Sequence, residues 1–282
     1  MIPAAFDYEV AESVDHAIAL LGEREDAKLL AGGHSLIPAM KLRVARPNVL
    51  VDVGRIADLS YVRESDGGQI AIGALTRHKD VASAALLREH CPIVSHTAGQ
   101  VGDPQVRHRG TIGGSLAHGD PASDLPTVVL ALDGELVVRG SAGERTIPAS
   151  AFFTGVFQTA VAPDEMLVEI RVPKLGSDTG WSYTKMSRRA QDWATVAVAA
   201  VVERPNGSIG KASIALTNMG ATPLRATAAE AAIAGGGSID DAAALAPEGT
   251  EPSSDLAASA EFRGHLARVL TRRALEEAAA RT

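Results

Sequence analysis

Residues 31–36, AGGHSL, and residues 107–126, RHRGTIGGSLAHGDPASDLP, are the two glycine-rich stretches that decide the fold of this 282-residue chain. Glycine lets the backbone adopt positive φ and brings N–H groups close to a ligand. We expect residues 102–126 to form one long polar loop, and such a loop inside a compact domain usually binds a ligand. Two separate stretches of this kind therefore predict a binding site that both help to build.

The first stretch stands between a predicted strand at 28–31 and a predicted helix at 36–42. A helix that begins near Ser35 adds unpaired N–H groups and the positive end of its dipole, which suit a pyrophosphate. The alternative is an ordinary strand-to-helix turn in which Gly32 and Gly33 serve geometry only, and this stretch alone leaves both open. Neither GxGxxG nor GKS or GKT is present, which excludes the standard dinucleotide and nucleotide-phosphate motifs.

The second stretch carries polar side chains beside its glycines. TIGGS supplies a second set of backbone amides, Ser115 adds a hydroxyl, and Asp120 and Asp124 are acceptors for sugar-type hydroxyls. A metal site made by His108, His118 and the two aspartates is a lesser alternative, because their spacing fits no helix-borne metal motif. Ser115 as a nucleophile is disfavoured, since TIGGSLA lacks the GxSxG turn.

Outward from these stretches, hydrophobic periodicity predicts two α/β sections. The first section has a helix at 14–21, and a strand at 48–54 follows the helix at 36–42. The second section is predicted to contain strands and helices at 69–72, 77–88, 92–101, 127–132 (the end of a helix) and 166–173. Asp133-Gly134 is predicted as a turn, and GELVVRG and ERTI after it resemble a β-hairpin.

The cluster PKLGSDTG at 173–180 is the predicted boundary before a third section. Extended runs follow at 181–187, 195–203 and 208–217, with a hairpin signal at Asn206-Gly207 between the last two. The remainder is Ala-rich and helical, apart from a loop at 247–254. The final helix is predicted to face the core through Phe262, Leu266, Val269 and Leu270. The third section is therefore predicted to be an antiparallel sheet backed by helices.

Composition limits the function. Hydrophobic residues make up 46% of the chain, which supports buried cores, and the net charge of −7 argues against nucleic acid as the main partner. The single cysteine, Cys91, reads as a small buried hydrophobe, and one thiol makes neither a disulfide nor an iron–sulfur cluster. No run of about 20 apolar residues is present, so no membrane span is expected. MIPAAFDYEV at the start lacks a secretory pattern, so the expected location is the cytoplasm.

Lys185 lies in YTKMSRRAQDW, residues 183–193, within a predicted extended run. From the residues alone, a lysine there is expected on the solvated face. That interpretation weakens only if the strand borders a redox cofactor, where a cation favours the reduced, anionic form.

AGGHSL and TIGGSLAHGDPASDLP, in this order and with KMSRRAQDW after them, resemble the flavin-binding loops of the xanthine dehydrogenase family of molybdenum hydroxylases. The resemblance covers essentially the whole chain. AGGHS, where relatives more often read AGGTD, is similar to the medium subunits of the aerobic carbon monoxide dehydrogenases within that family. The chain departs from the pattern at Ser115, where many relatives have Asn; both donate and accept hydrogen bonds, but serine reaches less far.

The resemblance implies an α+β fold. It consists of a vanillyl-alcohol-oxidase (PCMH)-type FAD-binding domain over residues 1–176, with α/β subdomains at about 1–57 and 58–176. A C-terminal domain of antiparallel sheet and helices, of the kind found in carbon monoxide dehydrogenase flavoproteins, is expected over residues 177–282.

The resemblance also assigns roles to residues. It implies that the first glycine-rich loop contacts the pyrophosphate and that the second contacts the pyrophosphate and the ribityl chain. Asp124 is implied to bind a ribityl or ribose hydroxyl, and Leu167 to touch the flavin. Lys185 is the implied cationic neighbour, and Trp193 is expected near the ring. The expected FAD contacts are Ala31, Gly32, Gly33, His34, Ser35, Leu36, Val101, Thr111, Ile112, Gly113, Gly114, Ser115, Asp120, Asp124, Leu167, Lys185 and Trp193. No catalytic acid, base or nucleophile and no metal ligand is expected.

The implied activity is electron relay in a complex. A large molybdopterin subunit oxidises the substrate, a small subunit with two [2Fe–2S] clusters passes electrons on, and FAD on this chain delivers them to an external acceptor. We expect a dimer of heterotrimers, with peripheral membrane association left open. Carbon monoxide is the first substrate expected; xanthine, aldehyde or N-heterocycle hydroxylases are the alternative. Rival hypotheses are a stand-alone flavin oxidoreductase, which the 4% aromatic content disfavours, and a non-enzymatic FAD-binding regulatory or assembly protein.

Overall fold

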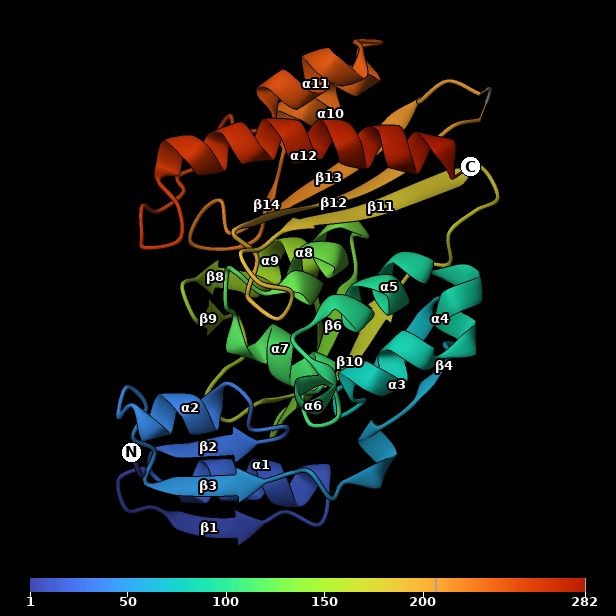
Figure 1. The fold of residues 1–282 in the computed structure, drawn as a ribbon. Coiled ribbons are helices and arrows are strands. Elements are labelled where there is room, and N and C mark those ends of the chain that lie inside the picture. The colour runs from blue at the N-terminus through green and yellow to red at the C-terminus, as the bar shows by residue number, and fades with distance from the viewer. Residues whose placement is uncertain (206, 282) are drawn as a thin grey trace.

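The main sheets of the molecule lie one above the other in chain order (Figure 1). The structure is a computed structural model, and it describes residues 1–205 and 207–281. A three-stranded sheet comes first, a five-stranded sheet lies in the middle, and a four-stranded sheet follows, with a small two-stranded sheet beside the middle one. The fold is α+β, with helices and sheets in every section, as predicted.

The first sheet is parallel, in the order β1-β3-β2. Its elements are β1 (Asp7–Val10), α1 (Val14–Glu23), β2 (Ala27–Leu30), α2 (Leu36–Lys41) and β3 (Val49–Asp52). The sequence predicted all of them except β1. The side chains of β1 are exposed or half-buried, so its sequence, DYEV, shows no hydrophobic run; pairing with β3 makes it a strand.

The middle sheet is antiparallel, in the order β4-β5-β10-β6-β7. Its strands are β4 (Val62–Glu64), β5 (Ile70–Gly73), β6 (Glu135–Gly140), β7 (Gly143–Pro148) and β10 (Met166–Val172). A 3₁₀ turn, η1, precedes it, and α9 with the β8–β9 hairpin precedes β10; these are η1 (Ala57–Leu59), α9 (Ala149–Phe152), β8 (Phe153–Gly155) and β9 (Gln158–Thr159).

Helices α3 (His78–Ser83), α4 (Ala85–His90) and α5 (Pro92–Gln100) pack together beside the middle sheet. The single helix predicted at 77–88 is divided in two. Ala84 is the reason: its backbone is extended, at φ −62° and ψ 120°, and it ends one helix and begins the next.

The prediction of one long loop over residues 102–126 is wrong. That stretch forms α6 (Pro104–Arg107), α7 (Ile112–His118) and the start of α8 (Asp124–Ala131). Thr111 caps α7 by accepting from the N–H of Gly114 at 3.1 Å. Gly113 lies where α7 crosses the backbone of Ala74, and a Cβ there would come within 2.5 Å of the Ala74 Cβ. These glycines therefore allow a helix to pack closely against its neighbour. Composition alone predicts a loop for such a glycine-rich stretch.

The third sheet is antiparallel, in the order β11-β12-β13-β14, and α12 runs across one face of it (Figure 1). Its elements are β11 (Thr179–Met186), β12 (Val196–Glu203), β13 (Lys211–Thr217), β14 (Leu224–Arg225), α10 (Thr227–Ala234), α11 (Ile239–Leu245) and α12 (Ala260–Ala280). Asn206 of the predicted hairpin signal is outside the described residues; β12 and β13, on either side of it, pair as predicted.

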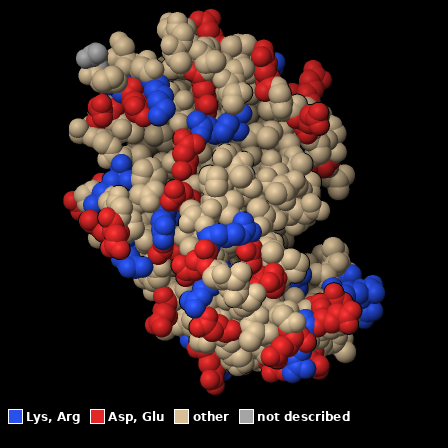
Figure 2. All heavy atoms as spheres, turned by 180° about the vertical axis from the view of Figure 1, so that it is seen from behind, with Lys and Arg blue, Asp and Glu red and all other residues tan. Residues whose placement is uncertain are grey.

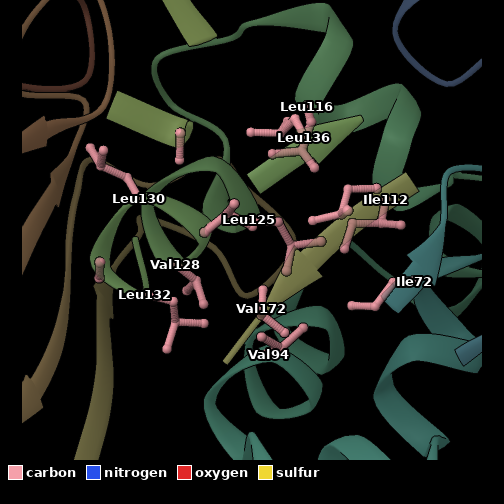
Figure 3. Close-up of a cluster of buried hydrophobic side chains, with 14 of the residues drawn as sticks. Ile72, Val94, Ile112, Leu116, Leu125, Val128, Leu130, Leu132, Leu136 and Val172 are labelled. Carbon is pink, nitrogen blue, oxygen red and sulfur yellow. The ribbon is translucent and has the colours of Figure 1, made fainter. Parts of the chain in front are cut away.

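The third sheet is buried on both faces. On β12, Val196 and Val198 pack in the cluster that includes the inner side of α12, whereas Ala197 and Ala199 join the core of the middle section. Alternate residues of a strand point to opposite faces, so an uninterrupted apolar run covers both. Figure 3 shows part of that middle core, where Ile112, Leu125 and neighbouring apolar side chains meet.

The inner side of α12 differs in part from the prediction. Leu266 and Leu270 are buried, but Phe262 is 46% exposed and Val269 is only half-buried. Arg263 is fully buried in their place. Its guanidinium donates to the carbonyls of Thr195 and Ser253 and forms an ion pair with Asp255, so hydrogen bonding satisfies a charge at a core position.

Polar contacts join the third section to the second glycine-rich stretch. The N–H of Asn218 donates to the carbonyl of Pro121, and its side-chain amide donates to Ala194 and Thr195. Acidic and basic side chains are interspersed on the outer surface, as Figure 2 shows for the rear face. None of the helices in the described part of the chain is long and apolar enough to span a membrane.

Candidate functional site

A cavity of about 870 Å³ is lined by residues from all three sections of the chain. Gly33 comes from the turn between β2 and α2, Ser115 from α7, and Lys185 from β11. The two glycine-rich stretches, more than 70 residues apart in sequence, meet at its wall. The volume lies within the ordinary range for pockets that hold cofactors.

At the first glycine turn the backbone is open to a ligand. Gly33 has φ +74°, and a Cβ on Gly32 would come within 2.3 Å of the carbonyl oxygen of Arg109, so the two turns touch through their backbones. Within residues 1–205 and 207–281, the N–H groups of residues 32–35 have no hydrogen-bond acceptor. A row of unpaired N–H groups facing a cavity is suited to an anion such as a phosphate.

At the second glycine turn the chain enters α7. Gly113 gives its N–H to the carbonyl of Ala74, and Gly114 gives its N–H to the Thr111 side chain. Ser115 shares a hydrogen bond of 2.8 Å with the hydroxyl of Ser123. The second turn is therefore held rigidly by its own contacts, while the first turn keeps its N–H groups available.

Asp124, Lys185 and Tyr183 form a buried polar group at the cavity. Lys185 Nζ lies 3.0 Å from Asp124 Oδ2, and the two side chains are 6% and 7% exposed. The Tyr183 hydroxyl donates to Asp124 Oδ1 at 2.7 Å. The prediction that Lys185 is solvated, made from the residues alone, is wrong, because the strand borders the cavity.

Burial governs the protonation of this group. It raises the pKa of the Asp124 carboxyl above its ordinary value, although the Lys185 charge and the Tyr183 hydrogen bond oppose that rise. Burial, with the charge of Asp124, raises the pKa of Tyr183 well above its usual range. Tyr183 thus stays a neutral donor. It was not among the expected site residues, and the available signal was its position two residues before Lys185, on the same face of the strand.

All but one of the residues expected to contact FAD line this cavity: Ala31, Gly32, Gly33, His34, Ser35, Leu36, Val101, Thr111, Gly113, Gly114, Ser115, Asp120, Asp124, Leu167, Lys185 and Trp193. Ile112 does not line it. Its side chain is fully buried in the core shown in Figure 3, and its N–H donates to the carbonyl of Thr76 at 3.0 Å. Trp193 lines the cavity with 68% of its surface exposed.

The cavity also has lining residues that the sequence did not single out. His78 is buried beside the second glycine turn, and Phe157 is exposed on the β8–β9 hairpin with φ +55°. The Phe157 ring lies 4.9 Å from that of His118. Neither residue stands in a glycine-rich motif, and the charged residues beside His78 (Arg77, Lys79 and Asp80) gave no indication that its ring is buried at the cavity.

A smaller pocket of about 550 Å³ adjoins the other side of the first glycine turn. Lys41, Arg55, Arg77 and Arg109 line it. Arg77 donates to the carbonyl of His108, while the other three form no ion pair in the described part of the chain. Asp52 also lines this pocket, so four cations stand against one carboxylate and the pocket beside the turn is net positive, although the chain as a whole carries −7.

His108, Asp120 and Asp124 of the second stretch, which were considered as metal ligands, each bond to a different group of the protein. His108 Nδ1 lies 2.6 Å from the carbonyl oxygen of Pro104, Asp120 accepts from the N–H of Ala122, and Asp124 is paired with Lys185. In the parts of the chain that the structure describes, no cluster of three or more such side chains could hold a metal ion.

Comparison with known proteins assigns the chain to a class. The family described as the FAD binding domain in molybdopterin dehydrogenase matches residues 4–175, and the carbon monoxide dehydrogenase flavoprotein C-terminal domain matches residues 181–278. The chain belongs to this family of flavoprotein subunits of molybdopterin dehydrogenases. As a member it is an oxidoreductase subunit with FAD as its cofactor.

Individual relatives narrow the comparison. The chain is 41% identical to the carbon monoxide dehydrogenase medium chain of Hydrogenophaga pseudoflava, over 100% of this chain and 99% of that one. It is 39% identical to the 6-hydroxypseudooxynicotine dehydrogenase complex subunit alpha of Paenarthrobacter nicotinovorans, over 99% and 96%. Among solved structures, a chain of reconstituted CO dehydrogenase from Oligotropha carboxidovorans matches with a TM-score of 0.97 at 41% identity, over the whole of both chains.

Proposed function

We propose that this chain is the flavin subunit of a carbon monoxide dehydrogenase. Bound FAD accepts electrons that originate at a partner's molybdenum centre and passes them to an external acceptor. The flavin part of the proposal rests on the unpaired N–H groups of residues 32–35, which line a cavity of about 870 Å³ where the second glycine turn meets the first. That arrangement suits a diphosphate flanked by two larger groups, as in FAD. The carbon monoxide part rests on the 41% identity to a carbon monoxide dehydrogenase medium chain.

The chain's own residues position the cofactor. In this proposal residues 31–36 hold the diphosphate through the backbone, and the cations behind that turn offset its charge. Asp124 accepts a ribityl or ribose hydroxyl: each of its oxygens already has one donor, Tyr183 or Lys185, and keeps a further lone pair. Lys185 then lies close to the flavin ring, where its charge favours the reduced, anionic form. Leu167 and Trp193 supply apolar surface.

We assign the FAD-binding domain to residues 1–176 and a separate C-terminal domain to residues 177–282. Because Lys185 and Trp193 line the cavity from the C-terminal part, that part completes the site.

We further propose assembly with a large molybdopterin subunit and a small iron–sulfur subunit, as a dimer of heterotrimers. Relatives named as a medium chain and as a complex subunit support a multi-subunit enzyme. The chain's single cysteine, Cys91, is buried, with a pKa raised to about 12 by burial, so it supplies no thiolate to a cluster. The clusters that feed the flavin therefore belong to a partner.

Reduction of the flavin by substrate tests the proposal directly. We expect the complex, purified with its partner subunits and kept free of oxygen, to show bleaching of its flavin absorbance when carbon monoxide is added. If an N-heterocycle or aldehyde bleaches it and carbon monoxide does not, the chain serves a related hydroxylase, which the 39% identity to the 6-hydroxypseudooxynicotine enzyme favours as the second candidate. A colourless complex that takes up no added FAD would overturn the proposal altogether.

A further inference from the structure

His78 contacts Gly110, at the point where the two glycine turns touch. It is the first residue of α3, and its backbone N–H donates to the carbonyl of Gly110 at 3.0 Å. The ring packs against the same glycine, since a Cβ on Gly110 would come within 2.8 Å of its Cδ2 and 3.1 Å of its Nε2. The residue is only 4% exposed and lines the larger cavity.

The ring has no polar partner within the described residues. Its Nδ1 is sealed from solvent without a hydrogen bond, and no described residue bonds to Nε2. A buried polar atom left unpaired costs about 1–3 kcal/mol, so such an atom calls for an explanation. The hydroxyls of Thr97 and Thr271 are also sealed without a partner, but neither lines the cavity. His78 alone among these three is placed where a ligand would meet it.

The surroundings determine where the ring proton sits. Burial, aided by the charges of Arg107 and His34, lowers the pKa of His78 to about 4, so the ring is neutral near pH 7. A sealed N–H without an acceptor is disfavoured more than a sealed lone pair. The proton therefore belongs on Nε2, and Nδ1 keeps the lone pair. His78 is then a neutral donor, and its N–H is at Nε2, the ring nitrogen that is not fully buried.

We propose that His78 is an FAD-binding residue, whose Nε2–H donates a hydrogen bond to a diphosphate oxygen held between the two glycine turns. The inference rests on the proposed function. It adds a side-chain donor to a site otherwise built from backbone amides at residues 32–35. A neutral donor there binds the anion while leaving no buried charge in the empty protein, where the ring faces Arg107 and His34.

Two substitutions separate hydrogen bonding from packing. His78→Leu keeps a similar volume and the backbone bond to Gly110 but removes the donor; His78→Gln restores a donor. We expect His78→Leu to raise the Kd for FAD about 10- to 100-fold, as for a lost hydrogen bond to a charged group, and His78→Gln to recover most of that loss. His96→Leu is the control, because His96 is an exposed histidine whose ring contacts Trp181 and which does not line the cavity.

The measurements are FAD affinity by flavin fluorescence, ADP competition as a probe of the diphosphate, and urea unfolding, all on the full chain. His78→Leu should weaken ADP and FAD together, while the flavin-free variant unfolds at the same urea concentration as the wild type or at a higher one, since an unpaired buried atom has been removed. Equal weakening by Leu and Gln, or FAD binding within about twofold of wild type in His78→Leu, overturns the inference. Wild-type protein that binds no FAD overturns the proposed function instead.

Discussion

At the scale of single residues, the site depends on glycines whose missing side chains let two turns touch. Gly32 is the tightest case, because its backbone lies against the carbonyl of Arg109. The sequence AGGHSL indicated that the backbone turns at this position. It did not show which of its glycines meets the other turn, because that contact joins residues 32 and 109, and no local pattern encodes it.

Gly32→Ala should therefore impair FAD binding more than its small size suggests. The added Cβ would meet the Arg109 oxygen at 2.3 Å, and relief requires the turns to separate. We expect a loss of about 1–3 kcal/mol in FAD binding, which is a rise in Kd of roughly 5- to 140-fold. Flavin content of the purified chain and FAD titration measure it. Gly99→Ala is the matched control, since nothing lies within 4 Å of its added Cβ; equal flavin content in both variants would contradict the close approach.

At the scale of elements, periodicity predicted the longer strands and helices well, but it missed the short strands β1, β4, β8, β9 and β14 and predicted the second glycine-rich stretch poorly. The β11, β12 and β13 strands matched their apolar runs, but α6 and α7 were missed because glycine and proline are read as loop signals. Tertiary packing decides that case: Gly113 is helical because α7 must pass over Ala74. In the same way Lys185 was predicted to be solvated, and only the packing of α8 against the third sheet places it against Asp124.

Lys185→Met tests the ion pair between Lys185 on β11 and Asp124 on α8. Removing one partner of a buried ion pair leaves an uncompensated carboxyl and costs about 3–5 kcal/mol, so the free energy of unfolding should fall by that order. FAD should remain bound with a more negative reduction potential. The shift should grow as pH rises, because Asp124, whose pKa burial already raises, ionises more fully at high pH.

Urea unfolding and a spectroscopic redox titration at two pH values measure both effects. Lys211→Met is the control: its pair with Glu203 is exposed, at 65% and 50%, and pairs of that kind contribute about 0–1 kcal/mol. An unchanged flavin potential in Lys185→Met would remove the role of Lys185 beside the ring.

At the scale of the whole molecule, three stacked sheets share one cavity, and sections far apart in sequence depend on each other. The sequence predicted the three sections and their order. It could not predict how they face each other, because contacts such as that between Asn218 and Pro121 join residues 97 positions apart. Buried His78 and partly buried His118 make this assembled state sensitive to acid.

Stability should fall in mild acid. The unfolded chain protonates His78 near pH 6.5, but the folded chain does so only near pH 4, so the free energy of unfolding drops as pH falls between these values. His78 should account for about 2 kcal/mol between pH 7 and pH 5. His96 and His118, whose pKa values are also lowered by burial, act in the same direction.

Urea unfolding of the flavin-free chain at about pH 7 and pH 5 measures this, and His78→Leu should lose about 2 kcal/mol less than the wild type. Equal losses in both proteins would show that His78 takes up its proton while folded.

The residues that line the cavity are spread widely along the sequence, and this affects the order of events during synthesis of the protein. Its walls are drawn from positions as early as Leu21 and as late as Trp193, and Asp124 acquires its counter-ion 61 residues later in synthesis. A nascent polypeptide that has not yet emerged through β11 carries both glycine turns but lacks the part of the cavity wall that Lys185 and Trp193 supply. We therefore expect the flavin to be enclosed only after the third sheet has docked.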